Sequence, residues 1–123
     1  MLVADDARDV ADVYCLLLSA AGYRVSRAYD GLTALSLAKV TKPDVAFLNQ
    51  NMPGMKGLEV LAELRLAGVR TKVIITSAER AFAELAFRAL GEGAEGCVQK
   101  PCPPQRLLSM LACALGQARG AGA

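Results

Sequence analysis

Polar residues that follow apolar runs could together hold a metal ion and a phosphate-like anion. Asp5 and Asp6 end one such run, and Asn49, Ser77 and Lys100 each come directly after another. A carboxylate pair, a carbonyl oxygen, a hydroxyl and an ammonium group are suited to a hard cation and a phosphoryl group. Taken singly, such residues are often helix caps, turn formers or surface lysines. Their shared placement favours one common site.

The chain alternates between apolar runs typical of buried strands and segments with helical spacing. The predicted strands are 1–4, 23–28, 44–48, 72–76 and 95–99. The predicted helices are 7–21, 32–41, 57–67, 77–93 and 103–116. This pattern predicts an α/β fold with a five-stranded parallel sheet and helices on both faces, a flavodoxin-like (βα)5 arrangement. The usual strand order, 2-1-3-4-5, would bring the polar strand ends to one edge.

Length and composition predict one domain. Residues 1–116 contain the alternating pattern, whereas 117–123 are small residues predicted to form a flexible tail or the start of a linker. No apolar run is long enough to span a bilayer, and acids close to Met1 are unlike a secretory signal. We therefore expect a cytoplasmic protein without a membrane partner.

Charge and composition argue against several function classes. The net charge is +2 with Lys and Arg interspersed, which argues against nucleic-acid binding by this chain alone. Histidine is absent, which removes Ser-His-Asp and Cys-His catalysis and a common metal ligand. The four cysteines have no CxxC spacing and are predicted to be reduced.

Over nearly its whole length the chain resembles the receiver domain of bacterial response regulators, in particular the chemotaxis-regulator type. The matching pieces, in order along the chain, are Asp5-Asp6, NMPGMKG at 51–57, Ser77-Ala78 and Lys100-Pro101. The resemblance implies that the peptide bond between Lys100 and Pro101 is cis.

The resemblance also implies a role for each matching residue. Asp6 would bind magnesium directly and Asp5 mainly through water, with the backbone carbonyl of Asn51 as a third ligand. Ser77 would hydrogen-bond the phosphoryl group, and Lys100 would pair with it as a point charge.

Asn49 is the main departure from the family's pattern. Counted back from Met52-Pro53, it falls where the family carries its phosphoacceptor aspartate. An acyl phosphate forms on a carboxylate oxygen, and the neutral amide oxygen is a poor nucleophile, so we expect no phosphorylation. Asn49 still offers a carbonyl oxygen as a metal ligand, but the site is one unit less negative. Magnesium binding should therefore be weak, about millimolar or weaker.

Two further side chains also depart from the family's pattern. Cys97 stands where the family often has an aromatic switch residue, and Lys56 stands where an acid is common and could pair with Asp5 or Asp6 in place of metal. Two interpretations stay open: a natural pseudo-receiver, or an ordinary phosphorylatable receiver with an engineered substitution at position 49. Cys97 and Lys56 favour the first, since a trapping substitution would not bring them along.

The predicted function is a signalling domain of a two-component phosphorelay that acts through protein contacts and is not an enzyme. A magnesium-dependent phosphatase is an alternative from another class, but ADDARD lacks its DxD arrangement. A purely structural subunit is a second alternative. The implied partners are a histidine kinase or an output domain, with a homodimer as a further option. The expected contact residues, from the fourth helix to the fifth, are Arg80, Glu84, Arg88, Glu92, Gln99 and Arg106.

Overall fold

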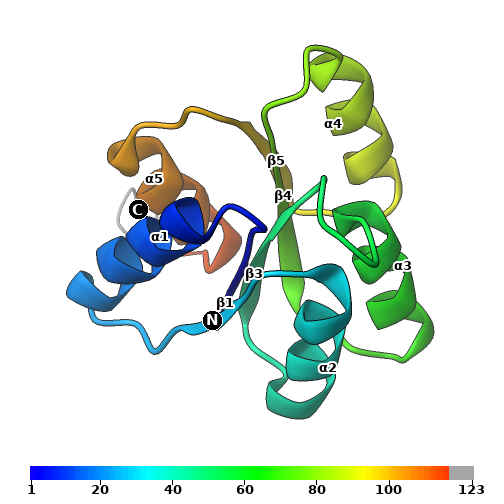
Figure 1. The fold of residues 1–123 in the computed structure, drawn as a ribbon, viewed down its shortest axis with the longest axis horizontal. Coiled ribbons are helices and arrows are strands. Elements are labelled where there is room, and N and C mark those ends of the chain that lie inside the picture. Colours follow the sequence, from blue (N-terminus) through cyan, green and yellow to red (C-terminus); the bar gives the residue numbers. More distant parts are fainter. Residues whose placement is uncertain (117–123) are drawn as a thin grey trace.

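The computed structural model describes residues 1–116 and shows a parallel sheet whose strands alternate along the chain with helices (Figure 1). The strands are β1 (Leu2–Ala4), β2 (Ser26–Ala28), β3 (Val45–Asn49), β4 (Lys72–Ser77) and β5 (Gly96–Gln99). The helices are α1 (Arg8–Ala20), α2 (Gly31–Thr41), α3 (Gly57–Leu66), α4 (Phe82–Gly91) and α5 (Pro104–Ala114). The strand order is β2-β1-β3-β4-β5 with all neighbours parallel, which confirms the predicted topology. The tail predicted for 117–123 lies outside the described residues.

Helices cover both faces of the sheet, α1 and α5 on one face and α2, α3 and α4 on the other (Figure 1). None of the helices in the described part of the chain is long and apolar enough to cross a membrane. Every residue of β3 is buried, and successive residues point into alternate cores. Ala46 and Leu48 pack with α2, α3 and α4, whereas Val45 and Phe47 pack with α1 and α5. A continuous apolar strand therefore requires a sheet that is covered on both faces.

The edge strand β2 is shorter than predicted. The pattern predicts a strand over 23–28, but β2 contains only Ser26–Ala28. Each of the three residues of β1 pairs with one residue of β2, from Leu2 with Ser26 onward. Because a strand at the edge of a sheet has only one neighbour for its hydrogen bonds, the length of β1 limits the length of β2.

The helix α4 begins later than predicted. Helical spacing predicts a helix over 77–93, but α4 spans Phe82–Gly91. The Ser77 side-chain oxygen accepts a hydrogen bond from the Glu79 N–H at 3.0 Å, which holds a turn at the end of β4. Gly93 has a φ of +100°, a left-handed conformation typical of the residues that follow a helix. Residues 78–81 are therefore a loop, and Ser77 belongs to the sheet edge.

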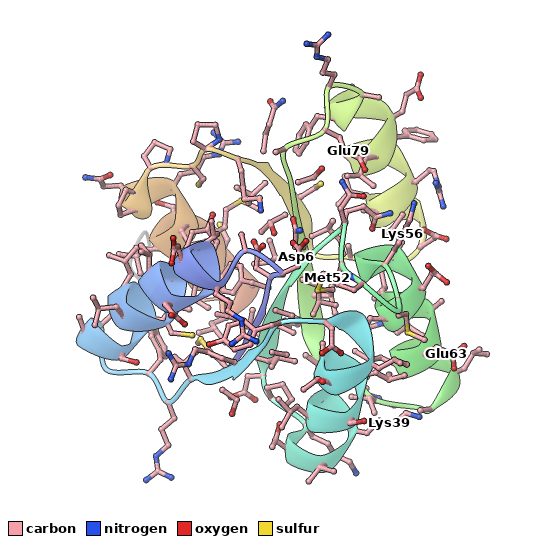
Figure 2. The ribbon with its side chains drawn as sticks, viewed as in Figure 1. Asp6, Lys39, Met52, Lys56, Glu63 and Glu79 are labelled. Carbon is pink, nitrogen blue, oxygen red and sulfur yellow. The ribbon has the colours of Figure 1, made fainter. Side chains whose placement is uncertain are left out.

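The loop between β3 and α3 is held against the start of α2. The Gly31 N–H donates to the Pro53 carbonyl oxygen at 3.2 Å, and a Cβ at Gly31 would overlap the carbonyl oxygen of Met55. Met52, in the same loop, is buried in the core beneath it (Figure 2). Only glycine allows α2 to approach so closely. The loop that carries Asn51 thus takes its position from α2 as well as from β3.

Gly31→Ala should lower the free energy of unfolding by about 1–3 kcal/mol, because α2 and the loop must separate to admit a methyl group. Gly91→Ala is the matched control, since a Cβ there meets no atom within 4 Å. We expect that control to be as stable as the parent or up to about 1 kcal/mol more stable, because Gly91 lies in α4 without a positive φ. Urea denaturation measures both variants, and equal stabilities would show that α2 does not clamp the loop.

Candidate functional site

The carboxyl edge of the sheet brings the predicted site residues together. Asp5 follows β1 and Lys100 follows β5. Between them, Asn49 and Ser77 are the last residues of β3 and β4. The register pairs Asn49 with Thr76, the residue before Ser77, so these two strands end almost level. The prediction that the polar strand ends share one edge is confirmed.

Asp5 and Lys100 form a buried ion pair at this edge. Asp5 Oδ2 and Lys100 Nζ are 2.8 Å apart, and the two side chains are only 2% and 15% exposed. The other carboxylate oxygen, Asp5 Oδ1, accepts a hydrogen bond from the Ala7 N–H at 3.0 Å. Both oxygens of the buried carboxylate therefore have a donor. The peptide bond between Lys100 and Pro101 is cis, as the family resemblance implies.

The Asn49 side chain is buried, and its amide nitrogen donates two hydrogen bonds. Nδ2 lies 3.2 Å from Asp6 Oδ1 and 2.8 Å from the backbone carbonyl oxygen of Asn51. Carboxylate and carbonyl oxygens only accept, so the amide must turn its nitrogen toward them. Asp6 lies at the carboxyl end of β1, where the loops meet (Figure 2). The amide thus joins the loop after β1 to the loop after β3.

The residues predicted to bind magnesium already have hydrogen-bond partners within the protein. A magnesium ion requires oxygen ligands directed at one point, roughly 2.1 Å away. Here the Asp6 and Asn51 oxygens face an N–H donor, and Asp5 faces an ammonium group. Within residues 1–116, no group of three or more His, Cys, Asp or Glu side chains is placed to hold a metal ion. This arrangement does not fit magnesium, and weak binding by Asp5, Asp6, Asn49 and Asn51 stays a prediction.

A cavity of about 390 Å³ adjoins Lys100. Its lining comes from α1 and from the loops after β4 and β5, and consists of Val10, Tyr14, Ala78, Lys100, Pro101 and Cys102. Burial raises the pKa of Tyr14 to about 12, so the hydroxyl is neutral at physiological pH. The small side chain of Ala78 forms part of the wall, which leaves room for a small molecule beside the ion pair.

Lys56 is not the lysine that pairs with the acids. Of the ion pairs in the described part of the chain, the only one at this edge joins Lys100 to Asp5. Lys56 is exposed at the start of α3, where its backbone N–H donates to Glu59 Oε1 at 3.1 Å. In Figure 2 it lies on the α3 side of the loop, apart from Asp6. The pairing that the sequence left open for Lys56 is therefore not made in this structure, where Lys100 reaches Asp5 from the end of β5.

Gln50 supports the site and is absent from the predicted residues. Its side chain is buried, and Oε1 accepts a hydrogen bond from the Leu58 N–H at 2.9 Å. Its backbone N–H donates to the Thr76 carbonyl, and its carbonyl accepts from the Gly57 N–H. Gln50 thus accepts hydrogen bonds from the N–H groups of Gly57 and Leu58 at the start of α3, and these bonds fix the path of the chain after Asn49. A polar residue between an apolar strand and a Pro-Gly loop is the signal that could have indicated it.

The residues expected to contact a partner are all exposed. They lie on or beside α4, at the end of β5 and on α5, and are Arg80, Glu84, Arg88, Glu92, Gln99 and Arg106. The predictions omit two large apolar side chains on α4, Phe87 and Leu90, which are 83% and 55% exposed. Exposed apolar side chains among charged ones are typical of protein interfaces.

Known proteins share both the sequence and the fold. The family model for the response regulator receiver domain matches residues 1–112. Response regulator MprA of Mycobacterium avium is 33% identical over 111 residues, which are 90% of this chain and 48% of MprA. The chain spans about half the length of the curated relatives it matches.

Solved receiver structures superpose on nearly the whole chain. The signal receiver domain of the response regulator NarL from Mycobacterium tuberculosis has a TM-score of 0.81 and 36% identity, covering 94% of each chain. The chemotaxis protein CheY4 of Vibrio cholerae has a TM-score of 0.84 and 30% identity, covering 92% of this chain and 95% of CheY4. Because the family model matches most of the sequence and the strand order is the predicted one, the chain belongs to the response regulator receiver domain family.

Proposed function

We propose that this receiver domain signals through protein contacts without being phosphorylated. The observation that carries the proposal is the buried amide at the end of β3, whose nitrogen faces Asp6 and Asn51. A receiver is phosphorylated by forming an acyl phosphate, which requires a carboxylate oxygen in line with the phosphorus. Asn49 has no carboxylate oxygen, so the reaction has no nucleophile.

The neighbours of Asn49 support placing it at the acceptor position. It ends β3 just before the Met52-Pro53 loop, and the Asp5–Lys100 ion pair lies at the same edge. Receiver domains generally bind Mg²⁺ at the phosphorylation site. In the proposal, Asp5, Asp6 and Asn51 correspond to the magnesium ligands. Ser77 and Lys100 correspond to the groups that contact a phosphoryl group.

Two explanations for the asparagine at position 49 are compatible with this proposal. The chain is either a natural pseudo-receiver or an ordinary phosphorylatable receiver that carries an engineered substitution. Cys97, which is partly buried against the core beside α4, and the exposed Lys56 both depart from the family's pattern. These departures are independent of position 49, and they favour the natural pseudo-receiver.

Receiver domains and response regulators are generally non-enzymatic signalling proteins that interact with histidine kinases and output domains. A phosphatase is the weaker alternative, because the acids after β1 are adjacent and not in a DxD arrangement. In the proposal the chain works in a cytoplasmic two-component pathway with a histidine kinase or an output domain as partner. The narrower likeness to chemotaxis regulators stays a prediction.

The proposed partner surface is the face formed by α4, β5 and α5. Phe87 and Leu90 lie about one helical turn apart on α4, with Glu84 and Arg88 beside them. An apolar centre with charged neighbours is the usual composition of an interface. Glu84 and Arg88 have opposite charges on one helix, so they could also pair with each other across the axis of a symmetric homodimer.

Asn49→Asp should restore phosphorylation, because it returns a carboxylate to the end of β3 and replaces the amide nitrogen that faces Asp6 and Asn51 with an oxygen. Incubated with magnesium and acetyl phosphate, this variant should gain one phosphoryl group that is stable in acid and labile to hydroxylamine. Intact-mass spectrometry measures the gain. The parent should gain none, and neither should Asn51→Asp, the matched control that adds the same charge in the loop.

A phosphorylated parent would contradict the proposal and would point to Asp5, Asp6 or Ser77 as the acceptor. A folded but inert Asn49→Asp variant would show that other residues have also disabled the site, which would leave a pure binding module.

Phe87→Ser should weaken binding to a histidine kinase or output domain by about tenfold or more, because it removes an apolar anchor from the proposed surface. Leu66→Ser is the matched control, since Leu66 on α3 is 82% exposed and Phe87 is 83% exposed. Calorimetric titration gives the affinities, and amide chemical shifts map the footprint. A footprint confined to α1 would rule out the α4–β5–α5 surface.

A further inference from the structure

We infer that the amide nitrogen of Asn49 substitutes for a metal ion: it ties the loop after β1 to the loop after β3 and keeps magnesium out. A cation bound at this edge would draw oxygen atoms of both loops toward one point. Here an N–H₂ group occupies such a point, 3.2 Å from Asp6 Oδ1 and 2.8 Å from the Asn51 carbonyl oxygen. The inference goes beyond the proposed function, since it concerns what holds the site together.

The amide is confined to this orientation. Turning it over would set its oxygen against two other oxygens, neither of which can donate a hydrogen bond. The Asn49 side chain is only 5% exposed, so solvent offers little replacement for the two lost bonds. The carbonyl oxygen of Asn49 therefore does not reach the place where a metal ligand is needed. A magnesium site that counts this oxygen as a ligand requires a different side-chain orientation.

Asp5 also has hydrogen-bond donors within the protein for both of its carboxylate oxygens. Asp5 accepts from the Lys100 ammonium group at 2.8 Å and from the Ala7 N–H at 3.0 Å. An incoming ion that approached Asp6 Oδ1 or Asp5 Oδ2 from the side of their present donors would have to displace the Asn49 amide or the Lys100 ammonium group. The lower negative charge of a site with Asn49 is thus one reason to expect weak magnesium binding. The hydrogen bonds already made by the Asp5 and Asp6 oxygens are a second, independent reason.

The loop after β3 has further anchors that involve no ion. Gln50 Oε1 accepts from the Leu58 N–H at 2.9 Å, and the Gly31 N–H donates to the Pro53 carbonyl at 3.2 Å. With the Asn49 amide on one side and these bonds on the other, the loop is held along its length. The arrangement of this edge should therefore be the same with and without magnesium.

Asn49→Ala separates the two reasons for weak binding, because it keeps the formal charge of the parent and removes only the amide. If charge alone limits binding, the variant should bind magnesium no better than the parent. If the amide excludes the ion, the freed Asp6 and Asn51 oxygens should bind it about tenfold more tightly or better. Asp6 and Asn51 are both exposed, so water can hydrogen-bond their freed oxygens, and the variant should fold.

The measurement is a titration with MgCl₂ at constant ionic strength, followed by the backbone amide shifts of residues 5–7 and 49–51. We expect no saturation for the parent up to about 10 mM and saturation for Asn49→Ala below it. Asn49→Asp is the positive control and should saturate at the lowest concentration. Equal affinities for the parent and Asn49→Ala, or a saturating parent, would overturn the inference.

The side-chain amide of Asn49 gives a second test that needs no variant. Because both donors are engaged and buried, its N–H₂ signals should exchange with water about tenfold more slowly than those of exposed Asn51. Equal exchange rates would overturn the inference even if Asn49→Ala does not fold. Neither result bears on whether the parent accepts a phosphoryl group, so failure here is distinct from failure of the proposed function.

Discussion

Polar side chains buried at the carboxyl edge of the sheet have to find their partners inside the protein. Asp5, Asn49 and Ser77 are all buried, yet no buried side-chain nitrogen or oxygen in the described part of the chain lacks a partner. An unpaired buried polar group costs about 1–3 kcal/mol, and an unpaired buried charge costs more. Two of these pairings also join distant segments, since Lys100 connects β5 to β1 and Asn49 connects β3 to the loop after β1. The candidate site is therefore part of what holds the edge together.

The same requirement sets how closely the neighbouring elements approach. The Gln50 side chain can accept a hydrogen bond from the Leu58 N–H only if α3 begins against the end of β3. A Cβ at Gly57 would lie 2.7 Å from the Asn49 carbonyl oxygen, so only glycine permits this approach. Gly31 allows the corresponding contact between α2 and the loop. Glycines and polar groups at this edge thus act together, because the glycines bring the backbones close enough for the polar groups to meet.

The sequence predicts those features that depend on position along a strand. Apolar runs indicate covered strands, the parallel order follows from the alternation, and residues after the strands must then share an edge, as Asp5, Asn49 and Lys100 do. It does not predict which donor meets which acceptor. Lys56 and Lys100 are equally plausible partners for an acid until the path of each loop is known. The start of α4 is predicted wrongly for a related reason. The helical spacing extends into 77–81, but a hydrogen bond from the Glu79 N–H to the Ser77 side chain forms a turn there in place of the first turn of the helix.

A ligand shifts a conformational equilibrium only if it binds one arrangement more tightly than another. At an edge where Lys100, Ala7 and Asn49 already donate to Asp5 and Asp6, an ion competes with these hydrogen bonds, and its preference for any one arrangement is reduced. In the proposed function, phosphoryl transfer likewise has no nucleophile at position 49. Under the proposed function, the one amide of Asn49 would account for the loss of sensitivity to both inputs. Under the proposed function, regulation of such a domain would act through a partner that binds the exposed face of α4, β5 and α5.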